Sequence, residues 1–261
     1  MNRIILERPI AVFDAGIGSY AIARKIADRF PGQDVLYFAD RANFPYGGKS
    51  RAELLAALRS TIERLESYGP AAIVIASNAP SVMVLHDLRA WSRTTLVGVF
   101  PPVRRAFDAS MTKRIAVLGV ASLISSPEIR AYVEREAEGQ GKVELLGASD
   151  LVELVENGAF LTDADGTLAA VQAKLDTLHP DTDVVTLSST HLPWLFRYFE
   201  KARPGVRFLD PADDVVGSVA PHVTEGSGAF RTLVSERQGY ELADFRRMLE
   251  RLGLDLAIER A

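Results

Sequence analysis

Cysteine is absent from the 261 residues of this chain. Its absence excludes disulfide bonds, cysteine-ligated zinc and catalysis by a thiol. No apolar run approaches the roughly 20 residues that a membrane-spanning helix needs. The first residues, 1–8, reach charged side chains too early to form a secretory signal. We therefore expect a soluble, cytoplasmic protein that does not associate with a membrane.

A basic surface is also missing. The net charge is -4 and the isoelectric point is near 5.7, whereas a nucleic-acid-binding domain normally carries a basic face. We therefore expect no nucleic-acid partner. Hydrophobic residues make up 48% of the chain, which is enough for one large core or two modest ones.

Short apolar runs rich in Val, Ile and Leu alternate with longer amphipathic segments. Such uninterrupted runs are typical of parallel strands that helices cover on both faces, and the alternation predicts an α/β fold. The predicted strands are 10–13, 35–38, 72–76, 96–100, 115–118, 143–146, 184–187 and 206–209.

Two helices have clear sequence limits. Residues 50–68 carry leucine and isoleucine at helical spacing, and Ser50 with Glu53 forms a capping-box pattern at the start. A final helix is expected around 241–251. Between it and the preceding segments, residues 225–228 read as a loose, glycine-rich stretch.

The chain also resembles itself. Residues 10–13 (IAVF) are similar to 115–118 (IAVL), and 75–79 (IASNA) are echoed by 187–191 (LSSTH). In the second pair, a buried type of strand runs into a polar turn that a proline follows closely. These matches predict two related α/β halves, although chance similarity between apolar strands remains an alternative explanation.

Ligands of open parallel sheets bind beyond the carboxyl ends of the strands. The polar residues at those positions lie in five short segments: 14–19, Asp40, 44–48, 77–79 and 189–191. Each has a simpler interpretation as well. Asp14 is a candidate helix cap, residues 45–48 are a turn by composition, and a lone histidine such as His191 is more often structural.

Nucleotide binding is a further alternative. Gly16 and Gly18 suit a phosphate-binding turn and Asp40 lies near the distance expected for a ribose-binding acid, but the third glycine of the dinucleotide fingerprint is missing. The other histidines, His86, His179 and His222, show no functional context, and no pair has the spacing of metal ligands.

Taken together, the motifs resemble the glutamate racemase family, the cofactor-independent branch of the aspartate/glutamate racemase superfamily. The segments that carry the resemblance are 13–18 (FDAGIG), 37–40 with 45–47, 75–79, 189–193 (STHLP), 154–158 (LVENG) and 210–212 (DPA). They occur in the family's order over nearly the whole chain.

The resemblance implies two pseudo-symmetric parallel-sheet α/β domains with the ligand site in the cleft between them. The first domain would comprise residues 1–97 plus 208–261, and the second 98–207. It also implies a small amino acid or related carboxylate as ligand, no cofactor and no metal. Family members often pair, which implies a homodimer, although no segment of this chain marks the interface.

The family's catalytic positions are implied as well. Two cysteines of the family face each other across the substrate α-carbon, and their positions match Ser77 and Ser189 here. The assisting aspartate, histidine and glutamate match Asp14, His191 and Glu156. The substrate-binding positions match Ala15, Pro45, Tyr46, Gly47, Asn78, Ala79 and Thr190.

This chain departs from the family at both catalytic cysteines. A serine hydroxyl is a far weaker acid than a thiol, whose pKa is about 8.5, so serine removes a proton only if a neighbour takes its own. Ala15, Ala79 and Ser188 also replace the family's usual serine, threonine and glycine. An engineered double substitution would not explain these three changes, and a natural divergent branch is favoured.

Three functions remain open from the sequence. The leading one is a racemase-like isomerase with weak or altered activity. The second is a catalytically inactive binding or regulatory relative that keeps the two-domain cleft. The third is a serine-dependent lyase or hydrolase, in which His191 activates Ser189 and Glu156 orients the histidine.

Overall fold

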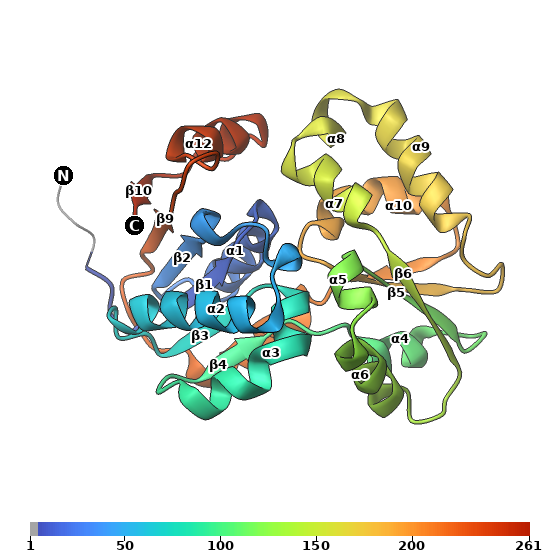
Figure 1. Ribbon diagram of the computed structural model, residues 1–261, viewed down its shortest axis with the longest axis horizontal. Helices are drawn as coiled ribbons and strands as arrows, with labels where there is room; N and C mark the ends of the chain where they lie inside the picture. Colours follow the sequence, from blue (N-terminus) through green and yellow to red (C-terminus); the bar gives the residue numbers. More distant parts are fainter. Residues whose placement is uncertain (1–4) are drawn as a thin grey trace. The chain divides into compact units, whose positions relative to one another are not determined.

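The structure is a computed structural model that describes residues 5–261. The chain divides into two compact units (Figure 1): residues up to 99 with 212–261 form the first, and residues 100–211 form the second. The predicted second boundary, 207/208, would cut through strand β8 (Arg207–Leu209). Because β8 pairs with β7 in the sheet of the second unit, that unit extends beyond the predicted limit.

The first unit is built on a six-stranded parallel sheet with the order β10-β9-β2-β1-β3-β4. Its strands are β1 (Ile10–Asp14), β2 (Val35–Ala39), β3 (Ala72–Ile75), β4 (Leu96–Gly98), β9 (Phe230–Val234) and β10 (Ile258–Arg260). Its α-helices are α1 (Tyr20–Arg29), α2 (Arg51–Glu66), α3 (Asn78–Trp91), α11 (Ala212–Val219) and α12 (Leu242–Arg251), and its 3₁₀ helices are η1 (Ile17–Ser19), η2 (Arg41–Asn43), η3 (Tyr46–Gly48) and η5 (Ala220–His222).

The second unit has a four-stranded parallel sheet with the order β6-β5-β7-β8. Besides β8, its strands are β5 (Arg114–Gly119), β6 (Lys142–Gly147) and β7 (Val184–Ser188). Its helices are α4 (Val103–Ala109), α5 (Ala121–Ile124), α6 (Pro127–Ala137), α7 (Ser149–Glu156), α8 (Ala159–Thr162), α9 (Ala164–Leu175), η4 (Leu192–Leu195) and α10 (Phe196–Ala202). Figure 1 shows α7 to α10 on one side of β5 and β6, and α4 with α6 on the other.

The two sheets repeat one strand order. The order β2-β1-β3-β4 of the first unit recurs as β6-β5-β7-β8 in the second. The similar runs 10–13 and 115–118 are the central strands β1 and β5, and the echoed segments 75–79 and 187–191 follow the equivalent strands β3 and β7. The prediction of two related α/β halves is therefore confirmed.

All eight predicted strands are present, and β9 and β10 were missed. Every residue of β1, β2, β3 and β7 is buried, as their continuous apolar runs indicated. In contrast, β9 includes Arg231 and Thr232 within its five residues, and β10 is a three-residue, largely exposed edge strand. Neither has the apolar run on which the prediction depended.

The helix predictions are also confirmed. Helix α2 begins after Ser50, whose side chain accepts from the backbone N–H of Glu53 while the Glu53 carboxylate accepts from the backbone N–H of Ser50. This reciprocal pairing satisfies N–H groups that the first turn of a helix leaves without partners. Helix α12 covers 242–251 of the predicted final helix.

The stretch 225–228 is not loose, because the carboxylate of Asp34 holds it. This buried side chain accepts from the backbone N–H and hydroxyl of Ser227 at 2.8 and 2.9 Å, from Ala229 N at 3.0 Å and from Glu7 N at 2.8 Å. Gly228 has a φ of +72° and lies so close to the Pro31 carbonyl that a Cβ would collide with it. The chain returning to β9 is thus fastened beside the start of β2.

We expect Asp34→Asn to destabilise the protein by about 1–3 kcal/mol at pH 7, because the side-chain amide of asparagine has one acceptor oxygen where the carboxylate has two. Burial raises the pKa of Asp34, but the hydrogen bonds from Glu7, Ala229 and Ser227 outweigh it and hold that pKa below its usual value. The stabilisation is therefore complete above the unfolded-state pKa and is lost as the pH falls through the folded-state pKa.

Urea unfolding of both proteins between pH 7 and pH 3 measures this difference. The exposed Asp28, changed to Asn, serves as the control and should alter stability by about 0.5 kcal/mol or less. A difference between wild type and Asp34→Asn that stays constant over the whole pH range would contradict the assignment.

Candidate functional site

Two aspartates meet at the carboxyl edge of the first sheet. Asp14 ends β1 and Asp40 follows β2, its neighbour in the sheet. The backbone N–H of Asp40 donates to the carbonyl oxygen of Asp14 at 2.7 Å, and both side chains are buried. Asp14 is not a helix cap: the N-cap of the following 3₁₀ helix is Gly16, and an oxygen of the Asp14 carboxylate accepts from the N–H of Ala15 at 2.7 Å.

Asp40 gathers the surrounding segments through its carboxylate, which is 1% exposed. It accepts five hydrogen bonds, all from uncharged side chains. The donors are Asn43 at 2.9 and 3.1 Å, Tyr46 at 2.8 Å, Thr61 at 2.9 Å and Ser235 at 2.9 Å. Since these bonds occupy the carboxylate, Asp40 has no capacity to accept from ribose hydroxyls. The nucleotide-binding alternative therefore lacks the acidic residue that it requires.

The turn Phe44–Gly48 hangs on this carboxylate. It contains a cis peptide bond before Pro45 and continues into η3, where Tyr46 is buried and Gly47 follows. Burial, the charges of Asp40 and Asp14 and the hydrogen bond to Asp40 together raise the pKa of Tyr46 well above its usual value. The phenol therefore stays a hydrogen-bond donor, and the turn is held against the carboxyl end of β2.

The third polar segment begins α3. Strand β3 pairs with β1, and Ala76 N donates to the Phe13 carbonyl at 2.8 Å, which places Ser77 beside Asp14 along the same edge. Ser77 is the N-cap of α3, but its side chain makes no capping bond. The first-turn N–H groups of Asn78 and Ala79 have no acceptor within the helix.

Asn78 has a polar atom to spare. Its side chain is buried, and Nδ2 donates weakly to the Val99 carbonyl at 3.4 Å. Its Oδ1 is buried with no hydrogen-bond partner among the described residues. Buried acceptors without a partner are rare in folded proteins. The Oδ1 of Asn78, at a helix N-terminus, therefore marks a position where a hydrogen-bond donor of a ligand would supply the missing partner.

The second unit places its predicted residues at the equivalent edge. Strand β7 ends at Ser188, and Ser189, Thr190 and His191 follow, all three buried. Glu156 is the last residue of α7, and its Oε2 lies 2.8 Å from Nε2 of His191. The two side chains are only 7% and 12% exposed, so solvent screens their interaction little.

Ser189 is not paired with the imidazole of His191. Its hydroxyl accepts from the backbone N–H of His191 at 3.5 Å. The imidazole of His191 forms its hydrogen bond through Nε2, and the partner is Glu156. The serine–histidine hydrogen bond that a hydrolytic triad requires is absent from the described residues of this site. One part of that hypothesis, the pairing of Glu156 with His191, is present.

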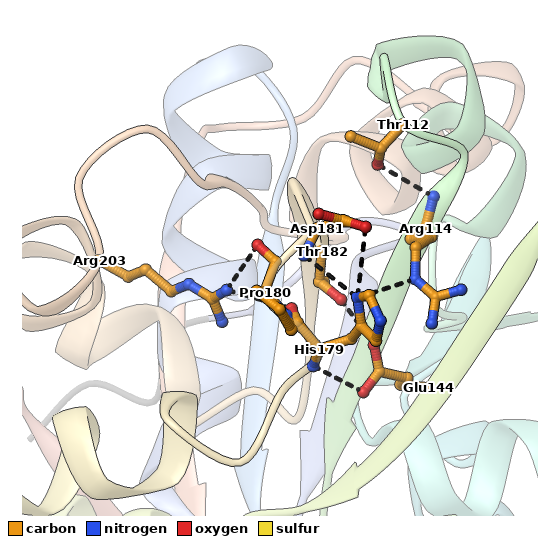
Figure 2. Close-up of polar contacts among 8 residues, drawn as sticks. All are labelled: Thr112, Arg114, Glu144, His179, Pro180, Asp181, Thr182 and Arg203. Carbon is orange, nitrogen blue, oxygen red and sulfur yellow. Dashed lines mark hydrogen bonds and ion pairs between the residues drawn. The ribbon is translucent and has the colours of Figure 1, made fainter.

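His179 belongs to a separate polar cluster, shown in Figure 2. Its Nδ1 accepts from Arg114 Nε at 3.1 Å and from Asp181 N at 3.2 Å, and its backbone N–H donates to Glu144 at 3.1 Å. His179 lies between α9 and β7, at the opposite end of that strand from Ser189. We infer that the cluster stabilises the connection between α9 and β7 by linking it to Arg114 of β5 and Glu144 of β6.

No group of three or more potential metal ligands occurs in residues 5–261. Over the same residues, no helix has the length and apolar character needed to cross a membrane.

Sequence reasoning missed the hydrogen bonds that hold the turn Phe44–Gly48 in place. Asp40 was predicted among the polar residues at the strand ends and weighed as a ribose ligand, but its hydrogen bonds to the turn were not predicted, and Thr61 and Ser235 were not considered. The signal for Asp40 was its place directly after β2, which repeats the place of Asp14 after β1. Nothing in the sequence indicated Ser235, since it follows the missed strand β9.

Comparison with known proteins places this geometry in a family. Residues 20–218 match the family described as Asp/Glu/Hydantoin racemase. A glutamate racemase from Roseiflexus sp. is 31% identical over 220 residues, covering 84% of this chain and 77% of the relative. A glutamate racemase from Saccharopolyspora erythraea is 31% identical over 242 residues, covering 91% and 86%.

Solved structures agree. Glutamate racemase from Thermus thermophilus, in complex with β-chloro-D-alanine, has a TM-score of 0.82 at 28% identity and covers 97% of this chain and 96% of its own. The Escherichia coli enzyme, with L-glutamate and an activator, has a TM-score of 0.83 at 25% identity and covers 97% of this chain and 98% of its own. The chain belongs to the Asp/Glu/Hydantoin racemase family.

Proposed function

We propose that this protein binds a small amino acid or a related carboxylate at the carboxyl ends of its strands and isomerises it without a cofactor, slowly. The observation that carries the proposal is the largely buried pair of His191 with Glu156, in which His191 lies two residues after Ser189, together with Ser77 at the equivalent position of the first unit. The family membership supports it. A cytoplasmic location and a homodimer stay predictions.

The binding chemistry follows from the start of α3. Free N–H groups at a helix N-terminus and the positive end of the helix dipole attract a carboxylate. The unmatched Oδ1 of Asn78 suits an N–H donor such as an ammonium group. Both halves of an amino acid are thus matched, while Ala15 and Ala79 contribute no side-chain hydroxyl.

The catalytic chemistry is limited by oxygen in place of sulfur. In the proposed step, the oxygen of one serine takes the α-proton while its own proton passes to Asp14 (for Ser77) or His191 (for Ser189). The other serine then gives its proton to the opposite face of the carbanion. Its partner, which starts the cycle protonated (Asp14 as the carboxylic acid or His191 as the imidazolium), replaces that proton. Because neither hydroxyl ionises near neutral pH, each transfer has to be concerted, which raises the barrier.

A ligand-binding protein without turnover is the second candidate. It is favoured by the replacement of both thiols, since one hydroxyl would already slow the reaction. It shares every binding contact with the first candidate and differs only in the proton transfers. Isotope exchange separates the two.

Deuterium wash-in at the α-carbon is the first test. We expect slow exchange in D₂O with one or more of L- and D-glutamate, aspartate and alanine, followed by chiral chromatography. The double variant Ser77→Cys/Ser189→Cys should accelerate exchange at least about a hundredfold, because a thiol is much closer to ionising at neutral pH. Ser77→Ala and Ser189→Ala should each abolish the interconversion of the two enantiomers, because each variant keeps a proton-transfer group on one face of the α-carbon only.

The exposed serine variant Ser67→Cys is the control and should leave the rate unchanged. If neither the wild type nor the double cysteine variant exchanges any of these amino acids, isomerisation is refuted. Ligand-induced thermal stabilisation without exchange would establish the binding protein instead.

The state of His191 gives a second prediction. An ionised Glu156 only accepts hydrogen bonds, so we expect the proton of a neutral His191 to reside on Nε2, leaving Nδ1 as the nitrogen for proton transfer. Two-dimensional ¹⁵N–¹H NMR of the imidazole reads the tautomer directly. Glu156→Gln should weaken this preference and slow isotope exchange about tenfold or more.

The signals of His86, His179 and His222 serve as internal controls and should not move. A wild-type His191 with its proton on Nδ1 alone would contradict the assigned role of Glu156.

A further inference from the structure

Arg41 and Arg231 are the buried basic side chains of the described part of the first unit. Arg41 begins η2, and its Nη1 donates to the carbonyl oxygen of Ala15 at 3.0 Å. Its guanidinium carbon lies 4.6, 5.4 and 5.7 Å from three aromatic ring centres, and the rings are those of Phe44, Tyr240 and Phe245. A guanidinium is weakly hydrated and stacks on aromatic faces, so this cage suits arginine better than lysine.

The edge that Arg41 supports carries two buried acids. Asp14 and Asp40 are joined through their backbones at 2.7 Å, and the charges of both contribute to the raised pKa of Tyr46. Two negative charges in a poorly solvated edge would repel an anionic ligand. A compensating cation therefore favours the binding of a carboxylate there, in addition to the N-terminus of α3.

Arg231 does not meet this requirement. It forms a two-pronged ion pair with Glu259 of β10, at 2.8 and 2.7 Å. It aligns with Leu36 near the start of β2, whereas Arg41 follows the end of that strand. Arg41 is next to Asp40 in the chain and hydrogen-bonded to the residue after Asp14.

The geometry points to Arg41 as the counter-ion of Asp14 and Asp40, and as the residue that makes this edge prefer a ligand with a second carboxylate over the corresponding neutral amide. Arg41 acts as a specificity-determining residue through its charge and its hydrogen bond to the Ala15 carbonyl oxygen. It does not touch the reacting atoms. The inference about specificity rests on the proposed function, while the inference about the counter-ion stands on the first unit alone.

Calorimetric binding of D- and L-glutamate and of D- and L-glutamine tests the specificity. The variants are Arg41→Met, which keeps the apolar stem, and Arg41→Lys, which keeps the charge. Arg237→Met is the matched control, because Arg237 stacks on the same Tyr240 ring at 4.4 Å but is exposed. Circular dichroism establishes that each variant is folded at the temperature of the titration.

We expect the wild type to bind glutamate about tenfold or more tightly than glutamine, and Arg41→Met to reduce this ratio about threefold or more. Arg41→Lys should restore most of the ratio, and Arg237→Met should leave it unchanged. An equal loss of affinity for both ligands in Arg41→Met would reduce Arg41 to a packing role and overturn the specificity claim. An unchanged ratio would overturn it too.

A second measurement needs no ligand. Arg41→Met removes the positive charge from this acidic edge, so the Tm deficit of the variant at pH 8 should shrink by about half or more at pH 5, where the protein carries less negative charge. In the contacts of the described residues, the ionisable groups around this cluster include Tyr46, Tyr240 and Arg237. Arg231→Met, an equally buried control whose partner Glu259 is partly exposed, should show a nearly constant deficit.

The two measurements separate the possible failures. A wild type that binds neither amino acid refutes the proposed function and, with it, the specificity claim. The pH series still decides whether Arg41 is the counter-ion: a deficit that is the same at pH 8 and pH 5 overturns that assignment.

Discussion

The carboxylate of Asp40 is the constraint on which the first half of the site depends. It is buried without an ion pair of its own in the described contacts, and it is stabilised by five hydrogen bonds from neutral donors. These donors come from four separate segments: η2, η3, α2 and the end of β9. A buried carboxylate is costly unless it is saturated in this way, so the turn Phe44–Gly48 has little freedom to leave β2.

The second unit solves a different problem at the equivalent strand end. There the acid at the end of α7, Glu156, pairs with the imidazole of His191 at 2.8 Å. His191 follows β7 together with Ser189, as Ser77 follows the equivalent strand β3. Such pairing orients an imidazole for proton transfer. The repeated strand order thus carries a mainly positioning acid in one unit and, in the function proposed above, a pair that transfers protons in the other. On that proposal, the serine hydroxyls, and not the scaffold, limit the rate.

The repeated fold was readable from the sequence because β1 and β5 are similar apolar runs, and because β3 and β7 are apolar runs that end in polar turns. The partners of those turns were not readable. Ser235 donates to Asp40 across 195 residues of sequence. Two of the three rings around Arg41 also come from far along the chain, one from α12 and one from the segment before it. Such long-range contacts leave no local pattern, and the short or polar strands β9 and β10 hid the segment that supplies them.

Hydrogen–deuterium exchange of Asp40→Ala against the wild type tests most directly whether one carboxylate orders this edge. In the wild type, the amides of Ala42, Asn43, Phe44 and Lys49 are hydrogen-bonded. The account predicts that they lose protection in the variant while the amides of β1 and β3 keep theirs. Unchanged protection of residues 42–49 in a folded Asp40→Ala protein would contradict it.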